Sequence, residues 1–383
     1  MKPIEVIKVN RAGVFSFFEK ALAWMMVFIP VMAASVQAKS LVESRHNLSA
    51  SGPGIKAVSE THICVFCHTP HLANPAAPQW NRPNSGAIYT PYNSSTTKAS
   101  IGQPTGSSKL CLSCHDGTVA LGMIISKAPV EFAGGLRGMP RGRSNLETDL
   151  SNDHPISFIY DSGLAALNGE LNDPSNLDPA VRLDAEGMLQ CTTCHDPHDD
   201  QFGQFLVKDN TASALCMECH DKDYWIGSAH QSSAATWNGR RPDPWPNSTE
   251  TSVDANACGN CHTSHDAGSD ERLLHYAAEE ENCFTCHNGN VAATNIEAEF
   301  KKISNHPVTA TTGVHDPAED ILNPTRHVEC SDCHNPHAVL DAEASAPIAS
   351  GALNQVVGIG SSGGIVDPLM NEYELCYRCH ADS

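Results

Sequence analysis

The pattern of hydrophobic and polar positions predicts one apolar segment near the start of the chain and little regular structure after it. The apolar run Ala21–Ala34 follows several basic residues and leads to small residues that end at Ala38. This order of basic, apolar and small residues is typical of a secretory signal peptide over residues 1–38, and an uncleaved membrane anchor is the alternative. Because no later stretch is apolar enough for a membrane helix, we expect a soluble exported protein.

The rest of the sequence predicts short helices and few strands. No sustained alternation of apolar and polar residues is visible, and such alternation would indicate half-buried strands. Short helices are expected over Leu215–Asp221 and Ala278–His287. The predicted fold is therefore mostly irregular and helical, with little or no β-structure.

The composition indicates that the chain lacks material for a large core. Hydrophobic residues make up 40% and aromatic residues 6% of the 383 positions, whereas there are 27 glycines and 24 prolines. Such a chain is expected to fold around something other than its own side chains. Its net charge of −20 argues against nucleic acid as a partner, because phosphates repel an acidic surface.

All sixteen cysteines occur in eight copies of one motif, Cys-x-x-Cys-His, numbered here from first to eighth along the chain. The cysteine pairs are Cys64 and Cys67, Cys111 and Cys114, Cys191 and Cys194, Cys216 and Cys219, Cys258 and Cys261, Cys283 and Cys286, Cys330 and Cys333, and Cys376 and Cys379. The histidines that follow them are His68, His115, His195, His220, His262, His287, His334 and His380.

This spacing is typical of covalent haem c attachment. Two thiols two residues apart reach the two vinyl groups of one porphyrin, and the adjacent histidine then lies under the iron as its proximal ligand. Zinc ribbons, thioredoxin-like sites and disulfide frameworks also use paired cysteines, but none of them requires a histidine after every pair. The sequence therefore predicts eight covalently attached haem c groups, whose porphyrins supply the missing apolar surface.

The odd-numbered motifs extend to Cys-x-x-Cys-His-x-x-His and divide the chain into four predicted di-haem modules. The modules cover residues 39–150, 151–227, 228–303 and 304–383. The added histidines are His71, His198, His265 and His337, and one more histidine precedes each pair of motifs: His46, His154, His230 and His306. Together they equal the number of distal ligands that eight irons need, and imidazole suits iron.

A short tether limits which iron each added histidine reaches. Three residues after the proximal histidine, it lies on the proximal side of its own porphyrin. We therefore expect it to bind a neighbouring haem, most simply the second haem of its own module, and the upstream histidines to bind the first. Two histidines just before a motif are alternatives: His62 in place of His46, and His327 in place of His306. The remaining two, His275 and His315, are expected at the surface or beside haem propionates.

The chain resembles the doubled-CxxCH multihaem c-type cytochromes of metal-respiring bacteria. The four Cys-x-x-Cys-His-x-x-His segments carry this resemblance, together with SRHNLSASGPG at 44–54, KLCLSCHDGTVALG at 109–122 and DHPISF at 153–158. The resemblance implies bis-histidine ligation, low potentials and a continuous stack of haems. It also implies a periplasmic shuttle, a porin–cytochrome conduit or an outer-surface filament.

These observations predict an electron-transfer protein in the periplasm or at the outer cell surface. Two imidazoles would saturate each iron, so no position is left for a substrate. The expected partners are donor and acceptor cytochromes, an outer-membrane porin, and further copies of the chain if it polymerises. The alternative is a multihaem reductase of nitrite, hydroxylamine or sulfur oxyanions. Such enzymes often replace one proximal histidine by lysine, whereas every motif here ends in histidine.

Overall fold

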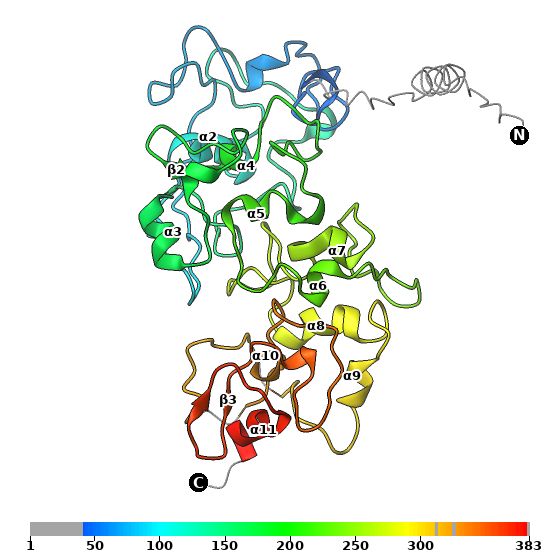
Figure 1. Ribbon diagram of the computed structural model, residues 1–383. Coiled ribbons are helices and arrows are strands. Elements are labelled where there is room, and N and C mark those ends of the chain that lie inside the picture. The colour runs from blue at the N-terminus through cyan, green and yellow to red at the C-terminus, as the bar shows by residue number, and fades with distance from the viewer. Residues whose placement is uncertain (1–40, 311–312, 324–326, 381–383) are drawn as a thin grey trace, which may run out of the picture. The chain divides into compact units, whose positions relative to one another are not determined.

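The computed structural model describes residues 41–310, 313–323 and 327–380, which belong to the compact unit Lys39–Ser383 (Figure 1). The predicted signal peptide lies outside these residues. Within the described ranges, no helix is both long and apolar enough to cross a lipid bilayer.

The longest helices of the described residues carry even-numbered motifs. They are α2 (Gly106–His115), α8 (Glu279–His287) and α11 (Glu372–His380). Each ends at the histidine of its motif. Acidic residues in the first turns of α8 and α11 stabilise these helices, because their negative charge lies at the positive end of the helix dipole. Helix α8 confirms the prediction over Ala278–His287. Helix α5 (Cys216–Cys219) is shorter than predicted because the backbone of His220 is extended.

The other helices are short, of one or two turns. The α-helical ones are α3 (Ser162–Asn168), α4 (Cys191–Cys194), α6 (Ala229–Ser232), α7 (Val253–Asn256), α9 (Ile296–Glu299) and α10 (Cys330–Cys333). The 3-10 turns are η1 (Leu41–Glu43), η2 (Cys64–Phe66), η3 (Ala133–Gly135), η4 (Pro174–Asn176), η5 (Thr211–Ser213), η6 (Ala257–Asn260) and η7 (Gly351–Leu353).

Named strands in the described ranges form two small antiparallel pairs. Strand β1 (Phe158–Ile159) pairs with β2 (Met188–Leu189), and β3 (Gly358–Ile359) pairs with β4 (Ile365–Val366). The registers place Phe158 opposite Leu189 and Gly358 opposite Val366. The prediction of a mostly irregular and helical fold with little β-structure is confirmed.

A recurring loop follows the first, third and fifth motifs. In each, the chain returns so that the motif histidine forms an antiparallel bridge with a later residue: His68 with Trp80, His195 with Leu206, and His262 with Leu274. The residue that follows the bridge partner donates its backbone N–H to the carbonyl oxygen of the motif's second cysteine, at 2.9–3.0 Å. The donors are Asn81, Val207 and His275. The backbone thus fixes the odd-numbered motif histidines in the same way three times.

Apolar packing is confined to small clusters in the described core. One contains Ala57, Phe66, Leu121 and Phe132, a second Tyr89, Leu112 and Leu150, and a third Phe158, Tyr160 and Leu189. Next to the first cluster lies the fully buried guanidinium of Arg82. It donates to the carbonyls of Leu121 at 2.7 Å, Ser113 at 2.9 Å and Ala120 at 3.1 Å, and so ties the end of α2 to the loop that follows.

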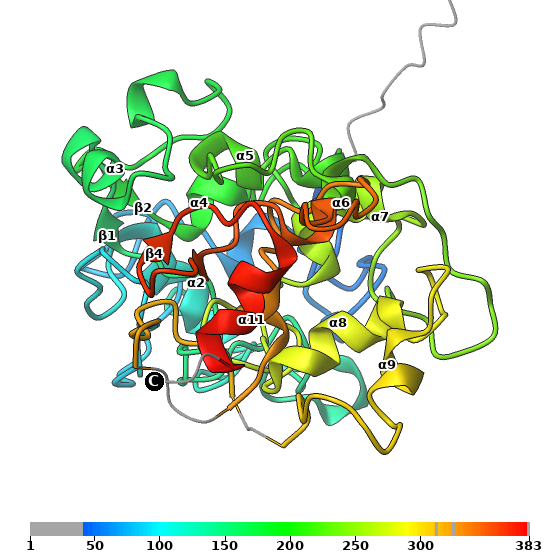
Figure 2. The ribbon, with the colours of Figure 1, turned by 60° about the horizontal axis from the view of Figure 1, so that its bottom comes forward.

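Helices of consecutive motifs lie against one another. Helix α2, with the second motif, contacts α4, with the third, and α8, with the sixth, contacts α10, with the seventh. Figure 1 shows α2 beside α4 and α8 beside α10, and Figure 2 shows the same helices turned by 60°. Motifs that follow one another in sequence are therefore neighbours in space.

Candidate haem sites

Seven of the eight motif histidines face a second histidine ring. The pairs, with their centroid separations, are His68–His198 at 6.0 Å, His115–His46 at 6.2 Å, His195–His265 at 6.2 Å, His220–His154 at 6.2 Å, His262–His337 at 6.3 Å, His287–His230 at 6.1 Å and His380–His306 at 6.1 Å. Two metal–nitrogen bonds of about 2.0 Å, added to two ring radii, span about 6 Å. The residues present therefore fit an iron between each pair.

Hydrogen bonds at Nδ1 orient these rings for metal binding. The Nδ1 atoms of four motif histidines lie 2.6–2.9 Å from backbone carbonyl oxygens: His115 from Ser144, His195 from Gln204, His262 from Arg272 and His334 from Ala352. Because a carbonyl only accepts, the proton sits on Nδ1, and the lone pair of Nε2 is left for a metal.

The facing histidines are oriented in the same manner. His46 Nδ1 lies 3.0 Å from the carbonyl oxygen of Pro197, and His230 Nδ1 lies 2.8 Å from that of Pro336. His265 Nδ1 lies 2.9 Å from the carboxylate of the buried Asp153. Asp153 was not singled out in the sequence, although the DHPISF segment contains it.

Burial keeps several of these imidazoles neutral, which is the form that binds metal. Burial lowers the pKa of His154 and of His262 below the usual value. At His337, burial and the nearby positive charge of Lys222 lower the pKa to about 3.

The pairing differs from the one predicted by spacing. His198, His265 and His337 were expected to serve the second haem of their own module, yet they face the first motif of the preceding module. The four upstream histidines were expected to serve the first haem, yet His46, His154, His230 and His306 face the second motif.

Contacts between predicted modules explain the difference. Each of three upstream histidines packs on the turn that ends the Cys-x-x-Cys-His-x-x-His segment of the following module. His46 and His230 do so through the proline carbonyls, and the backbone N–H of His154 donates to Ser264 at 2.8 Å. The turn thus directs its own added histidine back toward the preceding module. The prediction from the short tether considered only the two haems of one module.

The alternatives to His46 and His306 are not brought to a motif histidine. His62 Nδ1 lies 2.9 Å from Glu60, and the ring of His327 faces His315 at 6.4 Å. Two further histidines stand apart. Among the described residues, which include all twenty histidines, no other ring contacts the rings of His71 and His334.

The attachment cysteines of consecutive motifs lie close to one another. A hydrogen bond between the thiols of Cys111 and Cys191 raises the pKa of Cys111, and one between Cys283 and Cys330 raises that of Cys283. Burial, followed by the neighbouring Cys114, raises the pKa of Cys67 to about 12. In four further pairs, burial raises the pKa of the first cysteine and the nearby second cysteine raises it further. The pairs are Cys194 with Cys219, Cys216 with Cys258, Cys261 with Cys286 and Cys333 with Cys379.

Serine hydroxyls strengthen two of these links. Ser108, three residues before Cys111, accepts the backbone N–H of Cys191 at 3.0 Å. Ser213, three residues before Cys216, accepts that of Cys258 at 3.0 Å. The eight motifs are therefore arranged in space in the order in which they occur in the sequence.

Comparisons with known proteins agree with the motif pattern. Residues 185–224 and 251–292, which include the third to sixth motifs, match the family model of the doubled CXXCH motif. Over 205 residues the chain is 27% identical to the multihaem cytochrome MtrA of Shewanella baltica (strain OS185). That match covers 51% of this chain and 43% of the relative, so the chain spans less than half of the relative's length. The motifs, their arrangement and these matches support a doubled-CxxCH multihaem c-type cytochrome.

Proposed function

We propose that the chain is an exported octahaem cytochrome that carries electrons along haems attached in sequence order. The observation that carries the proposal is the set of seven histidine pairs with ring centroids 6.0–6.3 Å apart. Bound haem c supplies the one-electron chemistry, and the chain supplies attachment, axial ligands and order.

The ligand pairs favour a carrier over a catalyst. An imidazole on both faces leaves an iron without a position for substrate, and histidine in place of methionine lowers its potential. Carbonyl acceptors at Nδ1 increase the basicity of the ligands. The buried Arg82 lies beside Cys67 and Cys114, where its positive charge favours the reduced state of the first two haems.

Location and partners rest on the predicted signal peptide and on what the sequence resemblance to doubled-CxxCH cytochromes implies. We place the mature protein in the periplasm or at the outer cell surface. Its donor and acceptor would be other cytochromes, with an outer-membrane porin as the partner of a conduit. The ligand count is tested by intact mass spectrometry of the mature protein, which should show eight haems and no free thiol. Fewer haems would contradict the proposal.

The seventh motif supports a second candidate function. His334 is oriented like the other ligands by Ala352, yet within the described residues no histidine ring faces it. An iron held there would have an open position, which a reductase of nitrite, hydroxylamine or sulfur oxyanions needs. Turnover of one of these substrates with an artificial electron donor, lost in His334→Ala, would support catalysis. Absence of turnover would oppose catalysis and leave electron transfer as the function that the proposal supports.

Polymerisation offers another ligand for the seventh haem. His71 is exposed and faces no motif histidine, so His71 of a second copy is the ligand that a head-to-tail polymer would supply. Electron microscopy of the native secreted fraction decides this point. Fibres that His71→Ala abolishes would support a filament, and discrete monomers would oppose it.

A further inference from the structure

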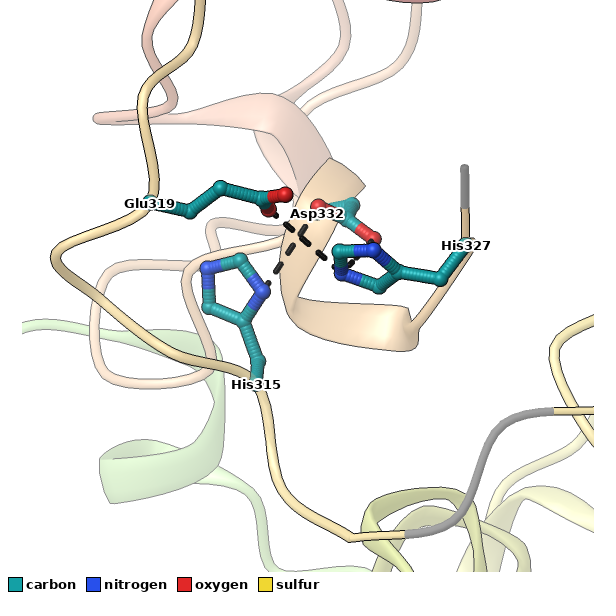
Figure 3. Close-up of side chains that lie close together, drawn as sticks. All are labelled: His315, Glu319, His327 and Asp332. Atoms are coloured by element: carbon teal, nitrogen blue, oxygen red, sulfur yellow. Dashed lines mark ion pairs between the residues drawn. The ribbon is translucent and has the colours of Figure 1, made fainter. Parts of the chain in front are cut away.

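Four side chains converge at a place that neither haem attachment nor the histidine pairs use. His315, Glu319, His327 and Asp332 come from the segment before α10 and from α10 itself, and point toward one centre (Figure 3). One donor atom from each lies within 4.8 Å of all the others. The side chains are 14–17% exposed, so the cluster is largely screened from water.

The separations suit a tetrahedral ion. Bonds of about 2.0–2.1 Å to Zn²⁺ place adjacent donors of a tetrahedron about 3.4 Å apart. His327 Nε2 lies 3.4 Å from Glu319 Oε2 and 3.9 Å from Asp332 Oδ2, and His315 Nδ1 lies 3.6 Å from Asp332 Oδ1. Movements well below 2 Å would bring the four donors to bonding distance of one ion.

His315 presents an unsatisfied nitrogen to this centre. Its Nδ1 atom is buried and forms no hydrogen bond in the structure. The backbone on which it sits is fixed, because its N–H donates to Glu279 Oε2 at 3.1 Å and Arg272 donates to its carbonyl. A buried nitrogen without a hydrogen bond is costly, and a metal bond would satisfy it.

Charge around the cluster favours a cation. Glu329 Oε2 lies 3.4 Å from His315 Nδ1 and 3.8 Å from His327 Nε2, and Glu279 lies behind His315. The opposing charges among the described residues are Arg378, whose Nη2 lies 3.6 Å from Asp332 Oδ1, and Arg272, which donates to the carbonyl of His315. Within the part of the chain that the structure describes, four carboxylates thus outnumber two guanidinium groups.

We propose that His315, Glu319, His327 and Asp332 bind one divalent metal ion of the zinc class. Two imidazoles and two carboxylates form a mixed nitrogen and oxygen donor set that Zn²⁺ accepts in tetrahedral geometry. Asp332 lies between Cys330 and Cys333, so the bound charge sits beside the seventh haem attachment site and raises the potential of that haem. The ion links the segment before α10 to the seventh motif.

Zinc binding to the holoprotein tests this site. The haem-loaded protein is stripped with a chelator and equilibrated with graded free Zn²⁺, and bound zinc is measured by mass spectrometry of the elements, relative to haem iron. We expect one ion per chain. His315→Ala and Glu319→Gln should each weaken its binding by at least about a hundredfold, since loss of a group that merely orients a ligand costs tenfold to a hundredfold. His275→Ala, outside the cluster, is the matched control and should bind zinc normally.

Three results would overturn the proposal. They are the absence of bound zinc in the wild type, equal zinc affinity in the wild type and His315→Ala, and loss of a low-spin haem in His327→Ala. The last result would make His327 an axial ligand. Low-spin haem signals that stay unchanged in the cluster variants show that the haem sites are intact, so failure here is distinguishable from failure of the electron-transfer proposal.

Discussion

Removal of His198 tests how the structure joins neighbouring motifs. Its ring centroid lies 6.0 Å from that of His68, so His198→Ala should deprive the haem on Cys64 and Cys67 of one of its two imidazoles. An iron with a single imidazole becomes high-spin and binds carbon monoxide. The wild-type monomer is expected to hold seven low-spin haems, so the variant should lose about one-seventh of the low-spin electron paramagnetic resonance signal. One additional carbon monoxide per reduced chain should bind as well.

A second background identifies which haem has changed. Replacing Cys64 and Cys67 by serine removes the first haem, so adding His198→Ala to that protein should create no new high-spin iron. The spacing of the sequence instead suggested that His198 serves the haem on Cys216 and Cys219. In that event one haem of the remaining seven would become high-spin, and this result would refute the pairing seen in the structure.

Three further changes test other parts of the account. Arg82→Met should lower the free energy of unfolding by about 3 kcal/mol, measured by urea titration of the holoprotein, because three carbonyls lose their donor. An unchanged urea midpoint would contradict this role of Arg82. Partial burial raises the pKa of Glu60, but hydrogen bonds from Lys127 and His62 outweigh it and bring the value to about 2. Lys127→Ala should therefore cost about 1 kcal/mol at neutral pH, a modest value because Lys127 is partly exposed. A depressed carboxyl pKa stabilises above the unfolded value, so this difference should vanish as pH falls from about 4.5 towards 2, and a constant difference would argue against it. His71→Ala should leave the spin state of the monomer unchanged, and a new high-spin haem in the monomer would show that His71 binds within its own chain.

Local chemistry predicts haem attachment at the motifs, and it made a motif helix predictable. The spacing of thiols and histidine is set by one porphyrin, and α8 coincides closely with the helix expected over Ala278–His287 because its first turn is acidic. These features depend only on residues near one another in sequence.

Contacts between distant segments made the pairing unpredictable. The hydrogen bond from His46 to Pro197 joins residues 151 positions apart, and the spacing within one motif does not predict such a contact. The cluster around His315 and Asp332 was missed for the same reason. His315 was expected at the surface or beside a propionate, and only the folded chain places it against a carboxylate inside a haem motif.

Spin-state quantification of the oxidised, monomeric holoprotein tests the central claim most directly. The histidine pairs predict seven low-spin haems and one carbon monoxide site per reduced chain, at the seventh motif. Two or more irons that take up carbon monoxide in the wild-type monomer would contradict the account.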